Sequence, residues 1–202
     1  MVAGTQARVP IQFTAYGDES DPGPYPVPRD APIEGGPASM GDRHVLVIDR
    51  DNNRLYELGV GYPSADAAGL PIFSGLAGYE EAARGPGGIA HALRFTAAAS
   101  RRAYVPPATH WASSNRSTSL PPMGLRVRLK AGFQIPAGFS AESKALLQSM
   151  KTYGLILADN GSNWYVSGAP DERWNNDALT SELRQVRGRD FEVLRMDGLV
   201  AG

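Results

Sequence analysis

A helix followed directly by two apolar runs is the feature that most restricts how this chain folds. Ser140 is a suitable helix N-cap, because its hydroxyl accepts a hydrogen bond from a free N–H of the first turn, and Gly154 is a typical C-terminal stop. The runs Leu155–Ala158 and Trp164–Val166 predict two strands, joined by a polar turn that begins at Asp159. This stretch therefore favours a sheet that carries a helix.

The composition limits both the fold and the partners. The chain has 202 residues, of which 42% are hydrophobic and 20% charged, and this suits one globular domain with a sizeable core. The formal net charge of -1 provides no basic surface for nucleic acid or for an anionic membrane. The chain has no cysteine and no apolar run of about 18 residues. We therefore expect no nucleic-acid partner, no membrane partner and no thiol chemistry.

The first forty residues form a separate compositional block. Its prolines and glycines exclude a regular helix and favour extended backbone. Apolar residues are spaced through the block, which is unusual for a pure linker. We predict an extended proline-rich N-terminal arm over residues 1–40, followed by a single β-rich globular domain over 41–202. The arm packs along the domain in one interpretation and is a loose tail in the other.

Strand patterns dominate the remaining chain. Residues 44–49 and 54–58 predict a β-hairpin, and 89–96, 125–130 and 191–194 predict further strands. A second helix is expected to begin at Asn176 or Asp177. The order of these elements never settles into βαβ units, so we predict an α+β, β-rich fold. We expect an antiparallel β-sandwich or a barrel-like sheet with two short helices.

Carboxylates are the strongest candidates for chemistry. Asp159 follows a buried strand and is surrounded by polar residues, so its pKa can suit a general acid or base. His91 is the predicted partner or proton carrier, and Asp49, at the end of the first strand, is the predicted second carboxylate. The alternatives are structural: Asp159 as an Asx-turn residue and His91 as a hydrogen-bonded core histidine.

Aromatic and polar residues near these positions suggest a binding surface. Flat indole rings suit the faces of sugar rings, and polar side chains suit their hydroxyl groups. No motif for a nucleotide or another cofactor is present, and we predict no cofactor. His44, His91 and His110 lack a recognised metal-ligand spacing, so we predict no metal either. The predicted substrate-binding residues are Trp111, His110, Asn163, Trp164 and Trp174.

Seven strings distributed over nearly the whole chain resemble a family of secreted bacterial proteins with no defined reaction. Some members of that family are joined to carbohydrate-binding or fibronectin-type modules. The resemblance implies an exported protein that works where polysaccharides are degraded. The strings are ESDPGPYP at 19–26, PIEGG at 32–36, GDRHVLVIDRD at 41–51, SADAAGLPI at 64–72, IAHALRFT at 89–96, LPPMGLRVRLKA at 120–131 and YGLILADNGSNWYVSGAPD at 153–171.

Two details qualify the resemblance. The N-terminus lacks the apolar core of a signal peptide, so we expect an export signal to have been removed before this numbering begins. Between Leu58 and Ser64 the chain has only GVGYP, where the family has a longer segment with a tryptophan and an additional strand. We expect the short 59–63 connection to lack a strand or part of a cleft that the family has. In that case this chain is a trimmed or inactive relative.

Three functions follow from these observations. The first is a secreted polysaccharide-active enzyme, a hydrolase or lyase that uses a carboxylate as acid or base. The second is a non-catalytic module that binds a polysaccharide or a cell-surface glycan. The third is an extracellular structural or assembly protein that associates with itself through the N-terminal arm.

Overall fold

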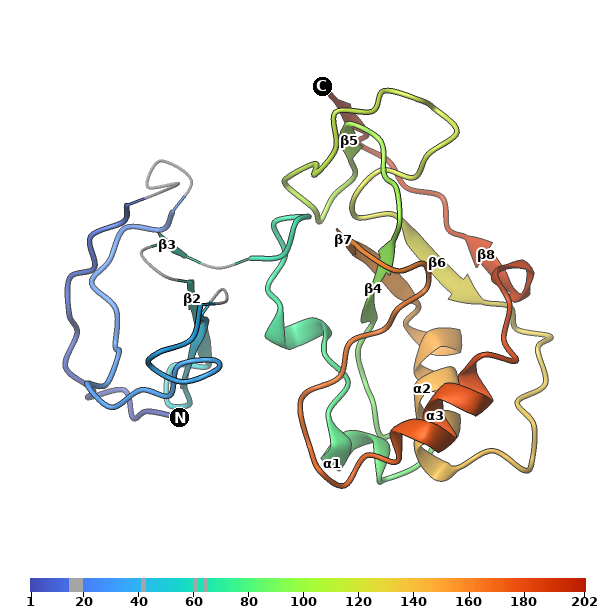
Figure 1. The fold of residues 1–202 in the computed structure, drawn as a ribbon, viewed down its shortest axis with the longest axis horizontal. Coiled ribbons are helices and arrows are strands. Elements are labelled where there is room, and N and C mark those ends of the chain that lie inside the picture. Colours follow the sequence, from blue (N-terminus) through green and yellow to red (C-terminus); the bar gives the residue numbers. More distant parts are fainter. Residues whose placement is uncertain (15–19, 41–42, 60–61, 64) are drawn as a thin grey trace. The chain divides into compact units, whose positions relative to one another are not determined.

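A computed structural model describes residues 1–14, 20–40, 43–59, 62–63 and 65–202. The chain divides into two compact units, Met1–Ala65 and Asp66–Gly202 (Figure 1). The predicted boundary after residue 40 falls inside the first unit, which contains both the proline-rich segment and the predicted hairpin. Part of the short 59–63 connection lies outside the described residues, because residues 60–61 are not described.

The first unit is built on a small antiparallel sheet. Its strands are β1 (Val45–Asp49), β2 (Arg54–Gly59) and β3 (Tyr62–Pro63), in the order β1-β2-β3. Asn53 adopts a positive φ of 51° in the turn between β1 and β2, where asparagine is tolerated better than most residues. The hairpin predicted from residues 44–58 is confirmed.

The proline-rich segment packs on this hairpin. The backbone N–H of Val2 donates to Ile48 O at 2.9 Å, and Val9 pairs with Tyr25 through two backbone hydrogen bonds. The ring of Tyr25 is buried and meets the ring of Tyr56 on β2 edge-on, with ring centres 6.0 Å apart. Backbone pairing and aromatic packing together hold the segment to the sheet of the first unit.

The second unit contains a four-stranded mixed sheet in the order β4-β7-β6-β8. β7 lies parallel to β4 and antiparallel to β6, and β8 pairs antiparallel with β6. A two-stranded ladder joins β5 to β9. The strands are β4 (Leu93–Ala97), β5 (Ala103–Tyr104), β6 (Arg126–Leu129), β7 (Leu155–Asn160), β8 (Phe191–Val193) and β9 (Val200–Ala201).

These pairings confirm the α+β class and correct two parts of the prediction. The expected wholly antiparallel sheet is wrong, because the chain crosses over through β6 and the following helix before β7 returns beside β4. The expected barrel-like closure is wrong as well, since within the described residues β4 and β8 remain at the two edges of the sheet.

Three α-helices accompany the sheet in the described residues: α1 (Tyr79–Ala82), α2 (Ala141–Thr152) and α3 (Asn176–Leu183). The helices predicted from Ser140 and from Asn176 are confirmed as α2 and α3. Short 3-10 turns lie at η1 (Phe73–Gly75) and η2 (Gly188–Asp190). In the described part of the chain, none of the helices combines the length and the apolar composition needed to cross a membrane.

The core of the second unit lies between the sheet and α2, which has α3 beside it (Figure 1). Alternate residues of the strands point into this core, as a strand with one buried face requires. The strand residues Leu93, Phe95, Val127, Leu129, Leu155 and Leu157 pack with the helix residues Ala145, Leu146, Leu147 and Met150.

The predicted strand at Trp164–Val166 is wrong. Trp164 has a positive φ of 61°, which interrupts extended backbone, and only a single bridge forms, between Val166 and Phe95. The segment is nevertheless fixed beside β4, because the N–H of Trp164 donates to Thr96 O and the N–H of Thr96 donates to Tyr165 O, both at 3.0 Å. It therefore protects the edge of β4.

The N-cap of α2 provides a test of this fold. The Ser140 hydroxyl accepts from the N–H of Ser143 at 3.2 Å and donates to Glu182 of α3 at 2.7 Å. Ser140→Ala should lower the free energy of unfolding by about 1 kcal/mol, because the first turn loses its cap. Urea unfolding followed by tryptophan fluorescence measures this, since all three tryptophans lie in the second unit.

Ser181→Ala is the matched control, because the Ser181 hydroxyl donates only to Ala178 O within its own helix. Equal losses for the two variants would contradict a special role for the Ser140 cap.

Candidate functional site

The polar cluster of the second unit consists of two carboxylates on either side of one guanidinium. The Nη2 atom of Arg94 on β4 lies 3.5 Å from Oδ2 of Asp66 and 3.8 Å from Oδ2 of Asp159. The two carboxylate oxygens are therefore no more than about 7 Å apart, with the guanidinium of Arg94 in contact with both. We call Asp66, Arg94 and Asp159 the charged triad.

A β-bulge determines where Asp159 points. Phe95 pairs with Leu157, but the next residue of β4, Thr96, pairs with Asp159, so Ala158 is an extra residue in β7. Without the bulge, strand alternation would place Asp159 on the core face with Leu157. The extra residue instead places Asp159 on the face of the sheet that carries Arg94.

Asp66 is held by a tight turn at the start of the second unit. Its Oδ1 accepts hydrogen bonds from the N–H groups of Ala68 at 3.0 Å and Leu70 at 2.9 Å, which leaves Oδ2 for Arg94. The N–H of Ala68 also donates to Ala158 O in the bulge of β7. The turn and the bulge are therefore tied together, and this brings Asp66 to Asp159.

The exposure of the triad falls steeply from one end to the other. The side chains of Asp159, Arg94 and Asp66 are 40%, 14% and 1% exposed. Burial raises the pKa of Asp66 to about 6, although the N–H of Leu70 and the charge of Arg94 both oppose the rise. Only Asp159 has enough exposure to touch a large substrate, and Asp66 can act on a substrate only through its neighbours.

Arg94 is incompletely satisfied. Both of its carboxylate contacts are longer than an ordinary N–H···O hydrogen bond, so they are charge contacts. Its Nε atom is buried and has no hydrogen-bond partner among the described residues. The Nε atoms of Arg43, Arg102 and Arg126 share this property, so it does not by itself distinguish Arg94.

One loop forms the rim of the triad. The N–H groups of Thr109 and His110 donate to Ala68 O at 2.8 and 3.2 Å, and Nδ2 of Asn160 donates to Ala112 O at 3.0 Å. The loop is therefore fixed to the neighbours of Asp66 and Asp159. The backbone of His110 is thereby tied to the turn of Asp66, and His110 is exposed to solvent. The ring of Trp111 packs with that of Tyr104, with ring centres 5.9 Å apart, and has the Arg102 guanidinium 5.4 Å from its centre.

His91 and Asp49 occupy other places. The ring of His91 lies 2.9 Å from Ala92 O and 3.3 Å from Oε2 of Glu81. It precedes Leu93, which pairs with Leu155, whereas Asp159 lies four residues further along β7, or roughly 13 Å. His91 thus lies towards the opposite end of β4 from Asp159.

Asp49 belongs to the first unit, where its carboxylate accepts from the backbone N–H of Asn52 at 3.2 Å and from its Nδ2 at 2.9 Å. The side-chain hydrogen bond from Asn52 holds the pKa of Asp49 below its usual value. Within the hairpin, Asp49 stabilises the turn between β1 and β2.

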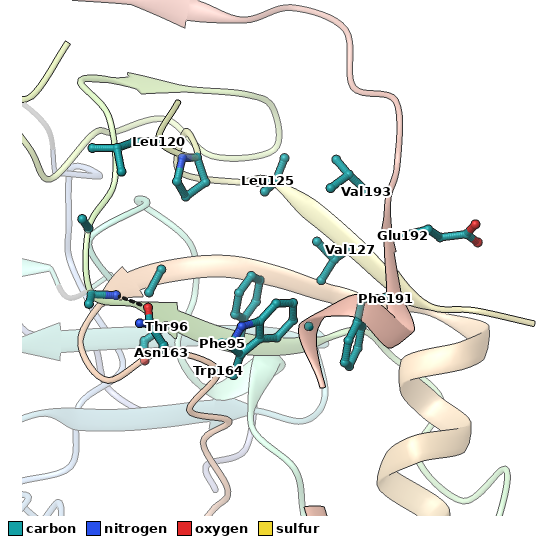
Figure 2. Close-up of a pocket in the computed structure, with 15 residues that line it drawn as sticks. Phe95, Thr96, Leu120, Leu125, Val127, Asn163, Trp164, Phe191, Glu192 and Val193 are labelled. Carbon is teal, nitrogen blue, oxygen red and sulfur yellow. Dashed lines mark hydrogen bonds between the residues drawn. The ribbon is translucent and has the colours of Figure 1, made fainter. Parts of the chain in front are cut away.

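Asn163 and Trp164 lie at a pocket of about 460 Å³ (Figure 2). Trp164 stacks on Phe95 with ring centres 5.4 Å apart and is tilted against Phe191 at 4.8 Å. The Asn163 side chain accepts a hydrogen bond from the N–H of Ala98 at 2.8 Å. The wall is largely apolar and also includes Leu120, Pro121, Leu125, Val127 and Val193.

Trp174 takes part in a different contact. Its Nε1 donates to Ala169 O at 2.9 Å, and its ring meets Tyr79 of α1 edge-on at 5.1 Å. The predicted binding residues are therefore distributed over the rim of the triad, the apolar pocket and the surface of α1.

The sequence interpretation overlooked Asp66 and Arg94. Asp66 lies in the string SADAAGLPI and Arg94 in IAHALRFT. Arg94 also interrupts the apolar pattern of its strand between Leu93 and Phe95, which places a cation on the polar face. These sequence features mark each residue separately, but they do not predict that Asp66 and Arg94 are in contact.

No protein-family model, curated protein or solved structure matches this chain. Within the described part of the chain, no group of three or more histidine or acidic side chains is arranged to hold a metal ion.

The raised pKa of Asp66 predicts that the free energy of unfolding depends on pH. Because its folded pKa lies near 6 and its unfolded value near 3.8, its contribution is complete below about pH 4 and is lost as the pH rises through 6. Asp66→Asn cannot ionise. The unfolding free energy of this variant, relative to the original chain, should therefore rise by roughly 2 kcal/mol between pH 4 and pH 7.

Urea unfolding at the two pH values measures that difference. Asp197→Asn removes a carboxylate that is 91% exposed and serves as the control. A difference for Asp66→Asn that is as flat with pH as that of the control would contradict the assignment.

Proposed function

We propose that this protein is a secreted carbohydrate-active enzyme in which Asp159 acts as general acid or base. The observation that carries the proposal is the charged triad, where an exposed carboxylate lies beside a guanidinium that a buried second carboxylate also contacts. Carboxylates arranged so that their environments differ are typical of acid–base catalysis.

The three residues have different roles in this proposal. Asp159 exchanges a proton with water or with the glycosidic oxygen, because it is the exposed member. Arg94 holds the Asp159 carboxylate in position and balances its charge. Asp66 is a positioning residue, since it is buried and acts on Asp159 through Arg94. Neither His91 nor Asp49 is needed for this step.

A glycan is the substrate that the surroundings favour. The rim loop carries His110, whose exposed imidazole suits sugar hydroxyl groups, and Trp111, whose indole packs with Tyr104 and Arg102. The resemblance to secreted proteins from polysaccharide-degrading systems points the same way. The proposal includes an extracellular location, a sandwich-like β architecture and self-association through the proline-rich arm of residues 1–40.

Asp159→Asn provides the direct test. Asparagine keeps the shape of the side chain and removes its ability to exchange a proton, so the rate should fall about 10²- to 10⁴-fold. The assay incubates the chain with plant, fungal and bacterial polysaccharides and detects soluble oligosaccharides by mass spectrometry. Asp197→Asn, which removes an exposed carboxylate elsewhere, should retain full activity. Equal activity of both variants would exclude Asp159 as the reacting group.

The apolar pocket favours a second candidate, glycan binding without cleavage. Trp164, which lines the pocket, is 43% exposed. An exposed indole at a pocket of about 460 Å³ suits one or two sugar rings.

Affinity electrophoresis with Trp164→Ala tests this candidate. Trp164 lines the pocket, so its removal should weaken binding of a retained polysaccharide at least about tenfold. Circular dichroism checks the fold of the variant, because Trp164 also stacks on Phe95. Tyr153→Ala, a partly exposed tyrosine at the end of α2, is the control. Retardation that is unchanged in a folded Trp164→Ala would reject the pocket as the binding surface.

A further inference from the structure

The charge balance of the triad restricts the substrate. Two carboxylates share one guanidinium, so the triad carries a net charge of one negative unit when both acids are ionised. Burial raises the pKa of Asp66 to about 6, and near pH 7 its carboxyl group is mostly ionised. The negative charge is therefore present under ordinary assay conditions.

The elements that carry the triad contribute two acids and one cation. β4 contributes Arg94, β7 contributes Asp159, and the turn at the start of the unit contributes Asp66. The rim loop adds His110, whose backbone is tied to Ala68, and Trp111, whose ring has the Arg102 guanidinium 5.4 Å from its centre. Among the described residues, Arg94 lies within 4 Å of both acids, and its charge is already balanced by them.

A negative site is unfavourable for acidic sugars. Elimination from a uronate needs a cation or a strong hydrogen-bond donor on the substrate carboxylate, because the proton beside that group must become acidic. A third carboxylate brought to Arg94 would instead meet two like charges at close range. A neutral sugar has no such repulsion, and an amino sugar is attracted.

From this balance we infer that the triad accepts glycan units without a carboxylate, either neutral or amino-bearing, and cleaves them by adding water. The inference rests on the proposed function and defines its substrate class. A water oxygen bonds to the anomeric carbon as the bond from that carbon to the glycosidic oxygen breaks. Asp159 takes a proton from the water and passes it, directly or through solvent, to the leaving oxygen, so that Asp159 is again a carboxylate. The balance is one water consumed per bond and an unchanged enzyme.

The test compares matched polysaccharides near pH 7, where Asp66 is mostly ionised. A neutral β-glucan and chitosan represent the non-acidic class, and polygalacturonate and alginate the acidic class. Reducing ends report hydrolysis, and ultraviolet absorbance of a conjugated double bond reports elimination. We expect saturated products from a non-acidic glycan, formed at least about tenfold faster than any product from the acidic ones.

The outcomes separate this inference from the proposed function. Products from a uronate polymer, saturated or unsaturated, formed as fast as those from the non-acidic glycans would overturn the substrate class while leaving a carbohydrate-active enzyme. No product from the four glycans or from the broader panel would reject the proposed function, and the inference with it.

A charge variant tests the cause of the selectivity. Asp66→Asn removes one negative charge from a residue that does not touch substrate, so the rate on polygalacturonate relative to β-glucan should rise severalfold. Asp197→Asn should leave that ratio unchanged. An unchanged ratio in Asp66→Asn would overturn the electrostatic explanation.

If Asp66→Asn fails to fold, as judged by circular dichroism, binding to the original chain provides the answer. Oligogalacturonate should bind more tightly as salt screens the site, and neutral oligosaccharides should not respond to salt. The opposite trend for the acidic oligomer would indicate a positive site and overturn the inference.

Discussion

The parallel pairing of β7 with β4 is the interaction on which the second unit depends. β7 lies between β4 and β6, so both of its edges are hydrogen-bonded, and Leu155 and Leu157 contribute to the core beneath α2. The turn into β7 passes very close to β6, because a Cβ atom on Gly154 would lie 2.5 Å from Val127 O. Gly154 also has a φ of +84°, so glycine is required there for two independent reasons. The extra residue Ala158 then turns Asp159 away from the core, and a structural strand becomes the support of a polar site.

The triad is costly to bury, and this makes its presence informative. Asp66 is almost completely inside the protein, and its contact with Arg94 is too long to be a strong hydrogen bond. An apolar residue at this turn would avoid the desolvation, but the turn itself needs an acceptor for the N–H groups of Ala68 and Leu70. An aspartate satisfies both N–H groups and leaves one oxygen facing Arg94. One oxygen of Asp66 therefore stabilises the turn, and the other contacts Arg94 of the triad.

Individual helices and strands of this fold can be predicted from the sequence, but the pairing of strands that are distant in the sequence cannot. The cap at Ser140, the stop at Gly154 and the alternation of Arg126–Leu129 identify α2 and β6 within a few residues. The parallel register of β4 and β7 joins residues about sixty positions apart, and nothing in either strand specifies it. Asp159 was identified as a candidate because it follows an apolar run. Its partner was not, since Asp66 reaches it only through the bulge and a turn that lies outside any strand.

The polar triad and the aromatic pocket depend on the same strand in different ways. Arg94 and Phe95 are consecutive residues of β4, so their side chains point to opposite faces of the sheet. The pocket wall is continuous with the core, because Phe95 and Val127 belong to both, and Figure 2 shows the Trp164 ring covering Phe95. Changes at Phe95 or Trp164 should therefore alter stability together with any binding at the pocket.

Asp159 lies at the exposed end of β7, outside that core, so chemistry at the triad can change while the packing of the sheet stays the same. The two faces of β4 thus allow a catalytic function and a binding function to be distinguished within one folded unit.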